Sequence, residues 1–80
     1  MEKEKLITQL RRIEGQLRGI ATMIETDRGL VPTMQQLMAA EASLQKTTRN
    51  YVQLFVRQKE EGMVELTQEQ LEYILKLISA

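Results

Sequence analysis

The chain has 80 residues with no Cys and no His, so disulfides, thiolate metal sites and imidazole ligands are excluded within it. It has no nucleophile–base pair and no Gly-rich phosphate loop, which argues against an enzyme. Eleven basic side chains balance eleven acidic ones, so only a local basic cluster, not net charge, could mark a nucleic-acid surface. No apolar run approaches a membrane span and no signal-peptide pattern is present. We therefore expect a cytoplasmic protein without cofactor or membrane partner.

The first predicted helix covers about residues 3–27 and is amphipathic. Its apolar residues recur every three or four positions and make one stripe along a helix: Leu6, Leu10, Ile13, Leu17, Ile20 and Ile24. Arg11 and Arg18 point roughly opposite this stripe, and Arg12 lies on its flank. The helix therefore offers one face to a partner helix and a basic face to water or phosphate.

Two glycines lie inside this helix, a third is expected to end it, and the single proline begins the next helix. Gly15 and Gly19 lie in its interior, either as tolerated surface glycines or as points where another backbone approaches closely. Gly29 is expected to adopt the left-handed conformation that ends the helix. Pro32 then fits the first turn of the next helix, where no backbone donor is needed.

The second predicted helix covers about residues 32–60. Its seam combines apolar and polar residues at helical spacing: Met34, Leu37, Glu41, Leu44, Thr48, Tyr51 and Phe55. Glu41 is either a charge that reaches the edge of the seam or a polar group that fixes helix register in an oligomer. Lys46 and Arg49 fall on the side opposite the seam.

The third predicted helix covers about residues 67–79. Thr67 and Gln70 have the spacing of a capping box, in which each side chain bonds the backbone N–H of the other residue. The helix is apolar over a broad face made by Leu71, Ile74, Leu75, Leu77 and Ile78. A short helix of this kind needs a surface to cover.

These elements predict a single all-α domain over residues 1–80, an antiparallel helical hairpin plus a short third helix. A chain of this length buries only about 60–65% of its unfolded surface, so a lone monomer is marginal. Two hairpins would close the uncovered seam as a four-helix bundle. We therefore expect a homodimer or a tetramer.

The sequence RRIEGQLRGI at residues 11–20 is the most specific block in the chain. Further residues continue the same pattern: Met23, Ile24, Glu25, Asp27, Arg28, Gln36, Leu37 and Ala39. This pattern resembles the family of copper-sensing operon repressors and nickel–cobalt repressors (CsoR/RcnR type). The resemblance implies helical dimers that assemble into tetramers, bind operator DNA and release it when an inducer is sensed.

The resemblance also locates a sensing site, and there this sequence departs from the pattern. The family's usual Cys at the start of the second helix, His in its last third and Cys one turn later correspond to Leu30, Phe55 and Lys59. None of these binds a soft metal ion, and no sulfur is present for persulfide or aldehyde chemistry. We expect no metal here. Leu30 and Phe55 either fill an apolar core or line a pocket for an apolar small molecule, with Lys59 at its mouth.

A DNA-binding surface is implied at five positions where the family tends to carry basic residues: Arg11, Arg12, Arg18, Lys46 and Arg49. Such side chains supply sequence-independent affinity for phosphates. Gln9 replaces an Arg that is frequent in the family. The structural alternative is that Arg11 and Arg18 only solvate the first helix, pairing with acidic residues at helical spacing.

Two hypotheses on function follow. The first is a DNA-binding transcriptional repressor that lacks the metal- or thiol-sensing site. The second is an oligomerisation module that no longer binds DNA and modulates a sensing paralogue. Binding to operator DNA separates them.

Overall fold

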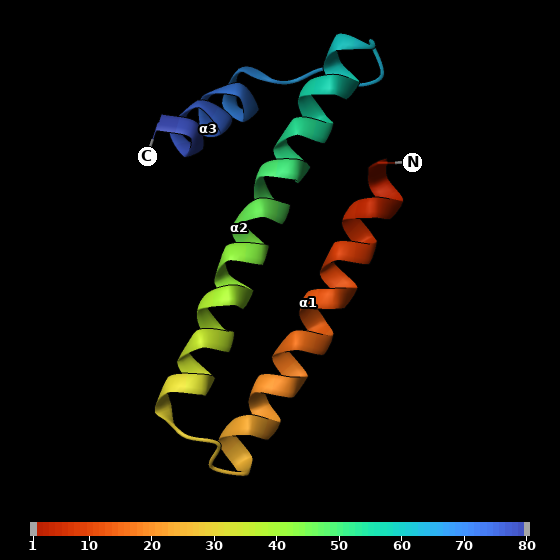
Figure 1. Cartoon of the computed structure of the whole chain (residues 1–80). Coiled ribbons are helices and arrows are strands. Elements are labelled where there is room, and N and C mark those ends of the chain that lie inside the picture. Colours follow the sequence, from red (N-terminus) through yellow and green to blue (C-terminus); the bar gives the residue numbers. More distant parts are fainter. Residues whose placement is uncertain (1, 80) are drawn as a thin grey trace.

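The computed structural model describes residues 2–79 and contains three α-helices (Figure 1): α1 (Glu2–Glu25), α2 (Leu30–Glu60) and α3 (Gln68–Ser79). Helices α1 and α2 run antiparallel as a hairpin, and α3 turns back alongside the C-terminal half of α2. No strand occurs among the described residues, so the expected all-α hairpin plus a short helix is confirmed for one chain. None of the helices, over the residues described, is long and apolar enough to cross a membrane.

The core between α1 and α2 is small. Leu6, Ile13 and Ile20 are buried on α1, and Ala40 and Thr47 are buried on α2. Each buried aliphatic side chain contributes about 1.5–3 kcal/mol, whereas ordering one backbone residue costs about 1–2 kcal/mol. The small side chains of α2 at this contact let the two helices approach. Most of the larger apolar residues of α2 lie outside this contact.

The predicted apolar stripe of α1 divides into two rows. Leu6, Ile13 and Ile20 face α2, while the second row remains 44%, 50% and 58% exposed at Leu10, Leu17 and Ile24. On α2, the seam residues Met34, Leu44 and Tyr51 are also exposed. We call these six residues the open apolar face: Leu10, Leu17, Ile24, Met34, Leu44 and Tyr51.

The turn between α1 and α2 differs from the expectation. The left-handed residue that ends α1 is Asp27, with φ 52°, and not Gly29. Two bonds close this end in the pattern of a Schellman motif: Arg28 N–H donates to the carbonyl of Met23 at 3.0 Å, and Asp27 N–H to that of Ile24 at 3.2 Å. Gly29 instead precedes α2 with φ 97° and ψ 158°, a region essentially restricted to glycine.

Helix α2 therefore begins at Leu30, two residues before the expected start at Pro32. The first helical bond across this turn runs from Thr33 N–H to the carbonyl of Gly29, at 3.3 Å. Pro32 lies within the first turn, where backbone N–H groups have no intrahelical partner, so its missing donor costs nothing.

The connection to α3 follows its predicted chemistry. Gly62, with φ 74°, ends α2 through a second Schellman motif. The predicted capping box is confirmed: Gln70 N–H donates to Thr67 Oγ1 at 3.1 Å, and Thr67 N–H donates to Gln70 Oε1 at 3.0 Å. The contribution expected from the Ile78 side chain lies outside the described residues.

The chain is a thin slab whose Cα atoms extend over 50 × 29 × 14 Å. Within it, helices α1 and α2 lie side by side as a single layer (Figure 1). Both broad faces of the slab are therefore surfaces, and each carries different side chains.

Candidate nucleic-acid interface

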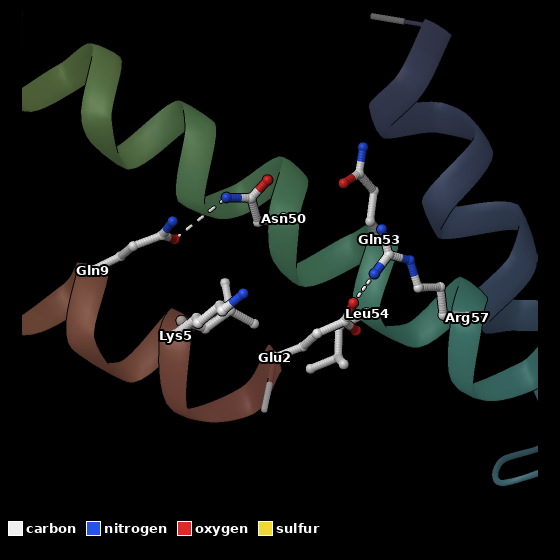
Figure 2. A pocket seen from close by; sticks show the side chains of 8 residues that line it. Glu2, Lys5, Gln9, Asn50, Gln53, Leu54 and Arg57 are labelled. Carbon is white, nitrogen blue, oxygen red and sulfur yellow. Dashed lines mark hydrogen bonds and ion pairs between the residues drawn. The ribbon is translucent and has the colours of Figure 1, made fainter.

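A polar groove runs along one side of the α1–α2 contact and consists of two adjoining hollows that share Gln9. The first, of about 160 Å³, is shown in Figure 2 and is lined by Glu2, Lys5, Leu6, Gln9, Asn50, Gln53, Leu54 and Arg57. The second, of about 210 Å³, is lined by Gln9, Arg12, Ile13, Gln16, Ser43, Lys46 and Thr47. We call these two hollows together the polar groove.

One hydrogen bond joins the helices across the groove. Asn50 Nδ2 donates to Gln9 Oε1 at 3.3 Å, and both side chains are half-buried (Figure 2). This bond uses one donor of Asn50 and the acceptor of Gln9. The Gln9 amide hydrogens and the Asn50 carbonyl therefore keep hydrogen-bonding capacity.

An ion pair lies at the outer end of the groove. Arg57 Nη1 contacts Glu2 Oε1, which joins the beginning of α1 to the last turns of α2 (Figure 2). Both side chains are about half-exposed, and such pairs contribute about 0–1 kcal/mol. The pair fixes the position of Arg57 more than it stabilises the fold.

The groove carries an excess of positive charge. Its cations are Lys5 and Arg12 from α1 and Lys46 and Arg57 from α2, and its one carboxylate is Glu2. Along α2, Lys46 and Arg57 are about 16 Å apart at 1.5 Å per residue. That distance corresponds to about five phosphates of a strand at 3.4 Å rise each, so the groove is suited to a row of phosphates.

The structure brings together two of the five predicted basic residues. Arg12 and Lys46 line the same hollow from facing helices. Arg11 and Arg18 are exposed on the side of α1 that faces away from α2, and Arg49 is exposed on α2 outside the groove. The two ion pairs between described residues involve Arg57 and Lys59 and none of these five side chains.

Two cations of the groove, Lys5 and Arg57, were not among the five predicted DNA-binding residues, although Lys5 was expected beside Arg12 on the flank of the first helix. A signal existed for each: Lys5 precedes Arg12 by two turns, and Arg57 follows Lys46 by three turns, so each shares a helix face with a predicted residue. The amides of Asn50 and Gln53 were missed as well, because no charge or spacing distinguishes them.

The polar groove and the open apolar face lie on opposite sides of the slab. In α1, Gln9 and Gln16 flank the buried row on one side, and Leu10 and Leu17 flank it on the other. In α2, Lys46 and Leu44 divide in the same way around Thr47. Since the polar flanks meet in the groove, the apolar flanks share the other side.

The three positions of the expected sensing site do not meet within one chain. Leu30 is the first residue of α2 and is 77% exposed. Phe55 is half-buried and lies about 37 Å further along the helix axis. Its ring packs edge-to-face on the ring of Tyr51, with 5.1 Å between the two ring centroids. Lys59 Nζ lies 3.7 Å from Glu65 Oε2. A site that contains both Leu30 and Phe55 would need a second chain.

The described residues also offer no group of three or more Asp or Glu side chains placed to hold a metal ion. Leu30, Phe55 and Lys59 supply no thiolate, imidazole or carboxylate. Their chemistry therefore does not fit a transition metal.

Comparison with known proteins gives a consistent result. The model of a family described as metal-sensitive transcriptional repressors matches residues 2–80. The copper-sensing transcriptional repressor CsoR of Bacillus subtilis is 44% identical over 43 residues, which cover 54% of this chain and 43% of that protein. The copper-sensing transcriptional repressor RicR of Mycobacterium tuberculosis is 39% identical over 49 residues, 61% of this chain and 51% of that protein. The chain thus spans about half the length of the curated relatives it matches. No solved structure matches significantly.

Proposed function

We propose a function from one premise: this chain belongs to the metal-sensitive transcriptional repressor family. It acts as a DNA-binding repressor, and its polar groove contacts the phosphate backbone. The observation that carries this proposal is the placement of Arg12 and Lys46, from facing helices, in one groove. Arg11, Arg18 and Arg49 extend the positive surface along the outer sides of the hairpin.

The mode of binding is mainly electrostatic. Lysine and arginine neutralise phosphates and release counterions, which supplies affinity without reading sequence. Among the described residues there is no pair of helices arranged as a helix-turn-helix with a recognition helix. Sequence preference therefore comes from the few groove amides and from DNA shape.

The open apolar face supports self-association. Its six large apolar residues stay exposed in one chain, and they are available to pack against a second chain. Two hairpins packed through this face form a four-helix bundle, with their polar grooves on the outside. A dimer, or a tetramer built from two dimers, then presents several grooves to one DNA duplex.

This repressor does not sense copper or another transition metal at the family's position. Leu30, Phe55 and Lys59 supply neither thiolate nor imidazole, which soft metal ions require. Isothermal titration with Cu(I) and Zn(II) tests this claim, and tight binding of either ion by the isolated protein would refute it.

A mobility-shift assay with DNA from the upstream region of the gene tests the function. We expect a shift at about 50 mM salt, where counterion release favours association. Arg12→Ala and Lys46→Ala should each weaken binding to all sequences and lower the salt slope by about one unit for each phosphate that the variant no longer neutralises. Lys76→Ala, in the last turn of α3, is the matched control and should leave both unchanged.

The alternative is an assembly module that has lost DNA binding. Zero net charge and Gln9, which replaces a family cation and is bonded to Asn50, favour it. Co-purification with a sensing paralogue and no DNA shift at about 50 mM salt would establish this alternative and reject the repressor.

A further inference from the structure

A second cavity lies between α2 and α3 and is unrelated to the polar groove. It has a volume of about 490 Å³ and is partly open to solvent. Helix α2 contributes Thr48, Tyr51, Val52 and Phe55, and the segment that ends in α3 contributes Leu66, Glu69, Gln70, Tyr73, Ile74 and Leu77. We call this cavity the α2–α3 pocket. Its volume is within the range of small-molecule sites, about 300–1,000 Å³.

The charges around the pocket have one sign. Among the residues that the structure describes, Glu69 is the only charged one that lines it, and no Lys or Arg does. The basic residues of α2 that adjoin the lining positions do not line the pocket: Arg49 follows Thr48 in sequence, Arg57 lines the polar groove, and Lys59 pairs with Glu65. An anionic ligand would therefore find repulsion and no partner. A neutral apolar ligand would cover the Glu69 carboxylate without compensating its lost hydration.

The rings of the pocket favour the same sign of charge. Tyr51, Phe55 and Tyr73 line it, and the first two pack edge-to-face with an interplanar angle of 75°. Aromatic faces attract cations, and the attraction increases where water is excluded. The remaining walls, formed by Val52, Ile74 and Leu77, are aliphatic.

We propose that the α2–α3 pocket binds a lipophilic organic cation, that is, an apolar body that carries one positive nitrogen or phosphorus centre. The cation lies between the aromatic rings and the Glu69 carboxylate, and the apolar body covers the aliphatic wall. Most of the pocket is built by one chain, so a second chain on the open apolar face would close its mouth without being required for its shape.

The position of the pocket connects it to DNA binding, and this part rests on the proposed function. Phe55 lies in the pocket on one flank of α2. The same helix carries Lys46 and Arg57 on its other flank. A cation in the pocket would therefore be the inducer that replaces metal.

The test uses two probes of the same shape and opposite charge. The full chain, which has two tyrosines and no tryptophan, is titrated with tetraphenylphosphonium and tetraphenylborate by calorimetry and tyrosine fluorescence, without DNA. We expect the phosphonium to bind at least tenfold more tightly. Glu69→Gln should reduce this preference severalfold, since only the aromatic rings then favour the cation, and Glu72→Gln, whose carboxylate lies outside the pocket, should leave it unchanged. Far-UV circular dichroism checks that each variant is folded.

The site is overturned by no binding of the phosphonium, by equal binding of both probes, or by a preference that Glu69→Gln leaves unchanged. Binding that occurs only after the oligomer dissociates also overturns it, because a second chain then fills the pocket. Ile74→Trp should block the cavity and abolish binding. If the phosphonium binds but does not release DNA in the mobility-shift assay, the site stands and only its role as inducer site fails. If no DNA is bound at all, the binding result still stands alone.

Discussion

Gln9 lies where the two hollows of the polar groove meet, between Lys5 on one side and Arg12 on the other along α1. Its carbonyl accepts the bond from Asn50, so a neutral contact between helices occupies a place where a cation could reach DNA. In the proposed mode of DNA binding, Gln9 therefore supplies a link between α1 and α2 in place of one phosphate contact.

Gln9→Arg should restore that cation. We expect tighter DNA binding and a salt slope steeper by about one unit per protomer that contacts DNA. Fluorescence anisotropy over a salt series measures both. Gln45→Arg, an exposed position of α2 outside the groove, is the matched control. An unchanged slope for Gln9→Arg would remove the groove from the DNA interface.

Thr67→Ala should loosen the start of α3. The substitution removes the bond from Gln70 N–H, and loss of such a cap costs about 0.5–2 kcal/mol. Amide hydrogen exchange at residues 68–71 should become faster. Thr8→Ala is the control with the opposite sign. Thr8 bonds only the Glu4 carbonyl within α1, and alanine is the better helix former there. Equal effects of both substitutions would contradict the role of the cap.

At the scale of helices, apolar spacing and cap residues predict the three elements, because both are local signals in the sequence. The turn at residues 26–29 is different. Asp27 and Gly29 both tolerate positive φ, and the choice between them depends on which carbonyls of α1 remain to be bonded. Pro32 suggested a helix start, but the first turn accepts proline at more than one position.

The rotation of one helix against the other was also beyond local signals. The α2 seam seemed the natural contact surface, yet Ala40 and Thr47 meet α1. Small residues allow the closest approach of the two backbones, and a pattern in one helix does not state which face its neighbour takes. Arg12 and Lys46 were predicted by type, but their meeting in one groove depends on this rotation.

Gly19→Ala should stabilise α1. A Cβ at Gly19 would meet no atom within 4 Å, so the substitution gains up to about 1 kcal/mol of helix propensity. Urea denaturation measures the gain. Gly62→Ala is the control and should destabilise, because φ at this position is 74°. A loss of stability for Gly19→Ala would mean that another backbone approaches α1 there in the assembled protein, the alternative left open by the sequence.

For the whole molecule, the central feature is a hairpin with a small core and six exposed apolar residues on one side. Leu17 belongs to that side and is half-exposed in one chain. Substitution of an exposed residue that touches no other element usually changes stability by less than about 0.5 kcal/mol. A larger loss of stability on substitution of Leu17 would therefore indicate that a second chain contacts this residue.

Leu17→Gln should lower the mass measured by light scattering and lower the melting temperature, which for an assembled protein depends on protein concentration. Arg18→Gln changes the adjacent residue on the outer side of α1 and should leave the mass unchanged. A monomeric parent protein, or a Leu17→Gln variant of unaltered mass, would argue against packing through this side.

The α1–α2 hairpin is a single layer of two helices, and α2 therefore belongs to both of its broad surfaces at once. The aromatic rings that line the α2–α3 pocket and the cations that line the polar groove project from opposite sides of α2. A roll of α2 by about 20° about its own axis would carry side chains at a radius of about 5–6 Å through about 2 Å, in opposite directions on the two sides. Binding in the α2–α3 pocket would therefore act on the groove directly, because α2 lines the pocket and also carries Lys46 and Arg57.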